Sequence, residues 1–376
     1  MKLRFLYFLF FLTAISAFLH FWSDKFPDPD VFYHFRHADL YWQNGLTVSD
    51  FPWTFYSVIN KFSSDIWYGF HLFLIPFTWF ENEIFGLDLA GAVMTVLALS
   101  VFYLTTKMAR IPYSFLWPFL LIFSSPHVLY RFTMLRPHVL SLVLSSLFFV
   151  FAVQGSFWGV FFTSFAVAFL HLGLFWAPIL IFGIVAVAKF FSEKIINWRS
   201  TSALILGLLS GWILRPNPLG ALKISYVQII DLMFVKQADV PLNFGMELFP
   251  MPFRDLSNFW PFVVLWLLAS FVFVRAILKK TPVISTHVRL FLWASLILSI
   301  MFFLIALFVA QRSFDFWVMF GVLFIAFVFS FIFNANNIHK YTCIAILAAL
   351  AVYSLNSYTR NIEKFGWDAG RFKPVS

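Results

Sequence analysis

Long apolar segments separated by short polar ones dominate this sequence from end to end. Runs of about 18 apolar residues are long enough to cross the hydrocarbon core of a bilayer. Runs of this kind, some slightly shorter, lie near residues 5–22, 86–106, 114–130, 137–153, 157–172, 174–190, 201–215, 259–275, 290–310, 316–333 and 341–356. We therefore predict an all-α integral membrane protein, a single polytopic domain over residues 1–376 with about eleven transmembrane helices. Residues 157–191 hold either two short spans hinged near His171, or one tilted span followed by a re-entrant piece.

Basic residues in the short connections predict the orientation, because Lys and Arg favour the cytoplasmic side of a membrane. In the eleven-span arrangement one side receives Lys2, Arg4, Lys107, Arg110, Lys189, Lys194, Arg199, Arg275, Lys279, Lys280, Arg289 and Lys340. The opposite side receives a first external loop over residues 23–85, a second over residues 216–258, and the tail. We expect the first loop to be helical, with Trp and Tyr holding Val31–Asn44 and Ser64–Phe80 on the membrane surface.

Composition agrees with this class and narrows the chemistry. With 61% hydrophobic and 11% charged residues, the chain lacks the polar surface of a soluble domain. The single cysteine, Cys343, excludes an internal disulfide and a Cys-rich metal site. The net charge of +9 fits a basic rim that faces anionic lipid, although it also suits a phosphorylated substrate. Nothing in the sequence indicates nucleic-acid binding.

An acidic cluster directly after the first predicted span carries the strongest chemical signal. It has the sequence Asp-Pro-Asp-Val-Phe-Tyr-His-Phe-Arg-His over residues 28–37. Asp28 and Pro29 are suited to cap and start a helix. Asp30, His34 and His37 then share one helical face, where Asp30 could orient His34 or the three could hold a divalent ion. Ionisable groups beside a membrane span call for a functional reason.

Together with motifs further along the chain, this cluster resembles the GT-C-type glycosyltransferases, polytopic enzymes that transfer sugars from polyprenyl-phosphate-type donors on the outer membrane face. The matching positions are Asp28, Pro29, Asp30, Phe32, Tyr33, His34, Gly45, Pro52, Thr54 to Ser57, Trp67, Arg136-Pro137-His138, His171, Asn217-Pro218-Leu219-Gly220 and Arg312. The resemblance covers most of the chain. It implies inverting sugar transfer to a glycan, lipid or protein acceptor of the cell envelope. It also implies a multi-pass protein of the bacterial inner membrane with its active site on the periplasmic side.

This reaction requires a carboxylate that takes the acceptor proton and cations that receive the developing phosphate charge. Asp28 and Asp30 are the candidate bases, and the resemblance favours Asp28. The candidate substrate or phosphate contacts are Arg136, His138, Arg312, His34, His37 and His171. A metal ion, Mg²⁺ or Mn²⁺, stays open, with Asp30, His34 and His37 as its tentative ligands.

Structural alternatives compete with several of these roles. Arg131 is expected to extend towards lipid headgroups, and Arg312 could form a local ion pair with Asp315. For the whole protein, the alternatives are a transporter or lipid flippase without covalent chemistry, and a non-catalytic scaffold. Transporters often contain inverted repeats and broken helices at the bilayer midplane. No convincing internal repeat is present, which favours an enzyme at the membrane interface.

Overall fold

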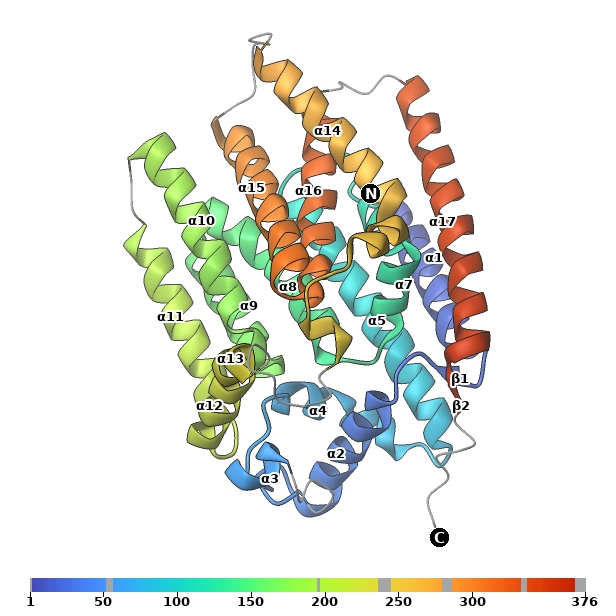
Figure 1. Cartoon of the computed structure of the whole chain (residues 1–376), viewed down its shortest axis with the longest axis vertical. Helices are drawn as coiled ribbons and strands as arrows, with labels where there is room; N and C mark the ends of the chain where they lie inside the picture. The colour runs from blue at the N-terminus through green and yellow to red at the C-terminus, as the bar shows by residue number, and fades with distance from the viewer. Residues whose placement is uncertain are drawn as a thin grey trace.

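The computed structural model describes residues 2–51, 57–194, 197–235, 245–278, 286–332 and 337–368. Over these residues the chain is helical apart from two short paired strands (Figure 1). Pro52, the segment Thr54 to Tyr56 and Lys236 lie outside the described residues.

The elements follow the predicted apolar runs closely. The helices are α1 (Lys2–Phe21), α2 (Asp30–Asn44), α3 (Val58–Phe62), α4 (Tyr68–Leu74), α5 (Glu83–Met108), α6 (Trp117–Phe123), α7 (Pro126–Thr133), α8 (Pro137–Gln154), α9 (Phe157–Leu170), α10 (Trp176–Glu193), α11 (Trp198–Ile213), α12 (Pro218–Tyr226), α13 (Leu232–Val235), α14 (Trp260–Leu278), α15 (Thr286–Phe308), α16 (Phe314–Ile332) and α17 (Asn337–Phe365). Shorter turns are η1 (Ile75–Trp79), η2 (Leu172–Leu174), η3 (Val227–Asp231), η4 (Met246–Leu248), η5 (Phe253–Phe259) and η6 (Gln311–Ser313). The strands are β1 (Lys25–Phe26) and β2 (Trp367–Asp368).

Six helical segments of the described chain are long and apolar enough to cross a membrane, which is the character of a multi-pass membrane protein. They are Glu83–Met108, Pro137–Gln154, Leu172–Phe191, Phe253–Leu278, Val288–Phe308 and Gln311–Ser330. Phe5–Phe21 and Phe157–Leu170 are shorter apolar helices. Eleven spans therefore stay a prediction.

One expected span, residues 114–130, is divided in the structure. Helix α6 ends before Ser124, whose hydroxyl donates a hydrogen bond to the carbonyl of Leu121. Helix α7 begins at Pro126, and the Ser125 side chain caps it by accepting from the backbone N–H of Val128 at 3.1 Å. Two hydroxyl side chains followed by a proline compete with the continuous helical hydrogen bonds and break the run.

Residues 157–191 form two helices, α9 and α10, joined at His171 and η2. Helix α9 also packs tightly against α11. A side chain at Gly211 would lie 2.6 Å from the carbonyl oxygen of Phe165, so the two backbones approach closely at this glycine. Small residues at such contacts stabilise helix pairs in lipid through van der Waals packing.

The predicted first loop, residues 23–85, folds against one end of the bundle. Helices α2, α3 and α4 gather at the lower end in Figure 1, together with α12 and α13. Arg215, just after α11, holds the loop there by donating hydrogen bonds to the carbonyls of Asp65 (3.2 Å) and Ala168 (2.5 Å). Strand β1 pairs with β2, so the segment that leads into α2 is held by the C-terminal end of the described chain.

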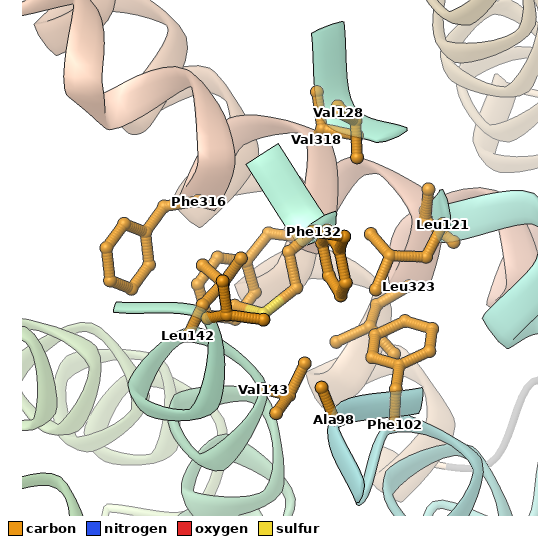
Figure 2. Close-up of a cluster of buried hydrophobic side chains, with 14 of the residues drawn as sticks. Ala98, Phe102, Leu121, Val128, Phe132, Leu142, Val143, Phe316, Val318 and Leu323 are labelled. Atoms are coloured by element: carbon orange, nitrogen blue, oxygen red, sulfur yellow. The ribbon is translucent and has the colours of Figure 1, made fainter. Parts of the chain in front are cut away.

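A buried core of large apolar side chains fixes the helices that carry the candidate site. Figure 2 shows Phe132 of α7 and Val143 of α8 beside Phe102 of α5 and Leu323 of α16. All four side chains are almost completely buried. Because this core immobilises both α7 and the start of α8, the arginines next to it have fixed positions.

Candidate active site

The acidic cluster meets Arg136 at the end of the bundle that carries the first loop. The Arg136 guanidinium donates two hydrogen bonds to the carboxylate of Asp28, one from Nε to Oδ2 and one of 2.7 Å from Nη2 to Oδ1. The same Nη2 lies 2.6 Å from Oδ2 of Asp30. Arg136 is the residue before α8, where Pro137 takes the first helical position. Three of the candidate site residues, Asp28, Asp30 and Arg136, therefore lie together.

The two aspartates differ in their surroundings. The Asp28 side chain is only 5% exposed and both of its oxygens bond to Arg136, whereas the Asp30 side chain is 53% exposed. Helix α2 begins at Asp30, with Pro29 rather than Asp28 in the capping position, so the expected cap is wrong by one residue. A long hydrogen bond of 3.4 Å from the Asp30 backbone N–H to Asp28 is what is left of that cap.

Arg131 and Arg312 join Arg136 through the carboxylate of Glu247, which lies between α13 and α14. Nη1 of Arg131 donates to Oε2 of Glu247 at 2.9 Å, while Nη1 of Arg312 lies 3.5 Å from Oε1. Arg136 is also near, with Nη1 3.7 Å from Oε1. Arg131 further binds Asp315, donating from Nε (3.2 Å) and Nη2 (3.1 Å).

Two of the structural alternatives are therefore wrong. Arg131 is buried and ion-paired instead of extending to lipid headgroups. Arg312 forms its ion pair with Glu247, whereas Asp315 pairs with Arg131. The cluster thus contains three guanidinium groups and four carboxylates.

Charge and burial set the protonation of two carboxylates of the cluster, Glu247 and Asp30. Burial alone would raise the pKa of Glu247, but attraction from Arg312, Arg131 and Arg136 outweighs it and lowers the pKa to about 2. Burial raises the pKa of Asp30, and repulsion from Asp28 and Glu247 adds to this, against the attraction of Arg136. Of these two carboxylates, Asp30 is thus the one that more readily takes up a proton.

Two further candidate residues, His138 and His171, are buried near the cluster. Neither ring nitrogen of His138 has a hydrogen-bond partner among the described residues, and its Nε2 lies 3.9 Å from Oδ2 of Asp315. Nδ1 of His171 likewise finds no partner within the described part of the chain. Buried imidazole nitrogens without partners are costly and suit groups that bind a ligand.

The remaining candidates, His34 and His37, belong to a network inside the first loop. Nδ1 of His34 and Nε2 of His71 are 2.8 Å apart, and Nδ1 of His71 is 2.6 Å from Oδ2 of Asp65. The ring of His37 stacks on His71 with centroids 4.6 Å apart, and the Tyr41 hydroxyl donates to Asp65 at 3.1 Å. One face of α2 therefore docks on α4.

This network corrects the tentative metal site. The described residues contain no group of three or more His, Cys, Asp or Glu side chains arranged to hold a metal ion. Asp30 turns to Arg136 and His34 turns to His71, so Asp30, His34 and His37 do not converge. Asp65, through His71, takes the orienting role that was expected of Asp30.

Sequence reasoning missed Glu247 as part of the site. It lies in a loop without a recognisable motif, 116 residues from Arg131 along the chain, and only folding brings the two together. A signal for Asp65 and His71 was present, since both are ionisable residues in an aromatic stretch of the first loop.

Comparison with known proteins adds no family: no protein-family model matches this chain, and no curated protein matches it. The function is therefore inferred from the cluster itself.

Proposed function

We propose that this protein is a GT-C-like membrane glycosyltransferase that moves a sugar from a polyprenyl-phosphate-type donor to an acceptor on the outer face of the membrane. The observation that carries the proposal is the cluster of four carboxylates and three arginines at the end of the bundle where the first loop docks. Groups of this kind can take a proton from a hydroxyl and face a phosphate.

Asp30 is the base in this proposal, and Asp28 positions Arg136. A base must be reachable by the acceptor hydroxyl, and Asp30 is half exposed while Asp28 is buried. Only Oδ2 of Asp30 is engaged by Arg136, and no partner is found for Oδ1 among the described residues. The raised pKa of Asp30 makes it a stronger base than an ordinary aspartate.

Arg312 is the principal phosphate contact in this proposal. Its side chain is 35% exposed, and its pair with Glu247 at 3.5 Å is loose enough for a phosphate to compete. His138 and His171 supply ring nitrogens that the described protein groups leave without partners. Arg131 and Arg136 hold the carboxylates in place, because Arg131 is buried, the Arg136 side chain is only 17% exposed, and each guanidinium pairs with two or more carboxylates.

The membrane arrangement in this proposal has eleven spans. They are α1, α5, α6 with α7, α8, α9, α10, α11, α14, α15, α16 and α17. The short helices α2, α3, α4 and α12 then lie together outside, consistent with their common end in Figure 1. This end is periplasmic if the protein belongs to a bacterial inner membrane, as the resemblance implies.

The test is sugar transfer by the purified protein in nanodiscs, with a panel of polyprenyl-phosphate sugars and membrane extract as the acceptor source. We expect transfer by the wild type, loss of it in Asp30→Asn and Arg312→Gln, and strong reduction in Asp28→Asn. Asp39→Asn is the matched control, since Asp39 lies on α2 but pairs with Arg36 and Gln43 away from the cluster. Equal transfer by all variants would refute the site, and loss of solute flux without a covalent product would support the transporter.

A further inference from the structure

Asp65 sits at the inner end of a hydrogen-bonded chain of side chains in the first loop. The chain runs from Asp65 to His71 and from His71 to His34, with distances of 2.6 and 2.8 Å. All three side chains are buried, and none belongs to the cluster of arginines and carboxylates. The direction of each hydrogen bond follows from which atoms carry hydrogens.

Asp65 fixes the first hydrogen bond. Its Oδ1 accepts the backbone N–H of Trp67 at 2.8 Å, and its Oδ2 accepts the hydroxyl of Tyr41. Burial opposes the charge, but the hydrogen bonds from His71 and from the Trp67 N–H favour it, and the pKa of Asp65 is lowered to about 2. An ionised carboxylate only accepts hydrogen bonds, so Nδ1 of His71 carries the hydrogen.

The next hydrogen bond joins Nε2 of His71 to Nδ1 of His34. With hydrogen only on Nδ1 of His71, Nε2 is an acceptor and Nδ1 of His34 donates to it. His34 is itself neutral, because burial above all, with the nearby Arg136 adding to it, holds its pKa well below the ordinary value. The unprotonated nitrogen of His34 is then Nε2, since the hydrogen bond to His71 uses Nδ1.

We propose that His71 carries hydrogen on Nδ1 alone, that Asp65 and His71 are thereby positioning residues that hold His34 in the tautomer with an unprotonated Nε2, and that this nitrogen accepts a hydrogen bond from a hydroxyl of the acceptor other than the one that Asp30 deprotonates. The second half rests on the proposed function. His34 lies one helical turn after Asp30, on the same face of α2. Its ring packs edge-on against Trp67, whose other contacts include the ring of His171. His34 is thus close to Asp30 and His171, two residues of the proposed site.

Replacing Asp65 with asparagine reverses the chain. The Trp67 N–H still requires an acceptor, so the amide oxygen of Asn takes the place of Oδ1 and the NH₂ group faces His71. His71 must then accept at Nδ1 and carry its hydrogen on Nε2, which donates to Nδ1 of His34. Nε2 of His34 gains a hydrogen and becomes a donor. Tyr41→Phe is the matched control, since it removes a hydrogen bond from the same oxygen without reversing the chain.

The experiment is ¹⁵N NMR of the full chain in nanodiscs with labelled histidine, His34→Gln and His71→Gln spectra serving for assignment. We expect His34 and His71 with hydrogen on Nδ1 in the wild type and in Tyr41→Phe, and on Nε2 in Asp65→Asn. A wild-type His71 in the imidazolium form, or a hydrogen on Nε2 of His34, would overturn the proposal. The wild-type spectrum decides this point even where Asp65→Asn does not fold.

Sugar transfer tests the hydroxyl contact separately. We expect Asp65→Asn to lower kcat/KM roughly 10- to 100-fold, as when an acceptor in a buried site is replaced by a donor, and Tyr41→Phe to leave it nearly unchanged. Equal activity of both variants would overturn the contact and leave the proposed function standing. If no protein transfers sugar, the proposed function fails. The hydroxyl contact is then tested by ¹⁵N NMR, with free glucose as the hydroxyl probe. A shift of the His34 Nε2 resonance in the wild type but not in Asp65→Asn supports the contact, and its absence refutes it.

Discussion

The pair formed by Arg136 and Asp28 should contribute strongly to stability, which Arg136→Met tests. Removing the guanidinium leaves the carboxylate of Asp28 charged and buried, and losing one partner of a buried ion pair costs about 3–5 kcal/mol. The second partner, Asp30, adds little, because an ion pair with so exposed a carboxylate is worth at most about 1 kcal/mol. The loss therefore comes almost entirely from Asp28.

The measurement is reversible unfolding in mixed micelles titrated with SDS and followed by near-UV circular dichroism. The double variant Asp28→Asn with Arg136→Met should lose less unfolding free energy than the sum of the two single losses, with a coupling energy of about 2–3 kcal/mol. Arg254→Met is the matched control, since Arg254 is 83% exposed and lies 3.7 Å from Asp255, and we expect no measurable change. A loss below about 1 kcal/mol for Arg136→Met, or additive losses in the double variant, would refute the reasoning.

Three further outcomes follow from the structure. The pKa of Glu247 is lowered from 4.5 to about 2 in the folded chain, so the stability that its charge contributes is fully present above pH 4.5 and lost as pH falls towards 2. Glu247→Gln should therefore remove about 2–3 kcal/mol of unfolding free energy at pH 7. A plot of unfolding free energy against pH should be flatter for this variant between pH 4.5 and 2. A base with the raised pKa of Asp30 loses activity as pH falls through that pKa, so the acid limb of sugar transfer should lie above pH 3.8 and a more acidic limb would contradict it. Gly211→Ala should lower the unfolding free energy by about 1–3 kcal/mol, because the added methyl group meets the backbone of α9. Gly183→Ala, with open space around it, should raise the unfolding free energy by up to about 1 kcal/mol. Changes of the same sign for both variants in SDS titration would refute the close packing of α9 on α11.

The helices were predictable because their apolar runs are long and local. The sequence of α5 or α8 contains all the information needed to expect a buried helix of that length. The break between α6 and α7 was missed, since hydropathy counts Ser124 and Ser125 as weak interruptions while their hydroxyls in fact compete for backbone hydrogen bonds. How many of the helices cross the membrane depends on the bilayer as well as on the chain.

The site was predictable only in part. Asp28, Asp30 and Arg136 could be expected to meet because topology places the end of the first span and the start of α8 on one face. The partner of Arg312 could not, since Glu247 lies in a loop whose path depends on packing. Their spacing predicted that His34 and His37 lie on one face of α2. It did not show whether this face packs against His71 or binds a metal ion.

The pairing of β1 with β2 has a consequence for how the protein is made. Lys25 donates a hydrogen bond to the carbonyl of Glu363, 338 residues later in the chain, and Asp28 follows β1 almost directly. At a translation rate of 5–20 residues per second, the strand leading into the site waits roughly 20–70 s for its partner. The strand that precedes Asp28 is therefore paired only after the last described helix has been synthesised, and unfinished chains lack this restraint.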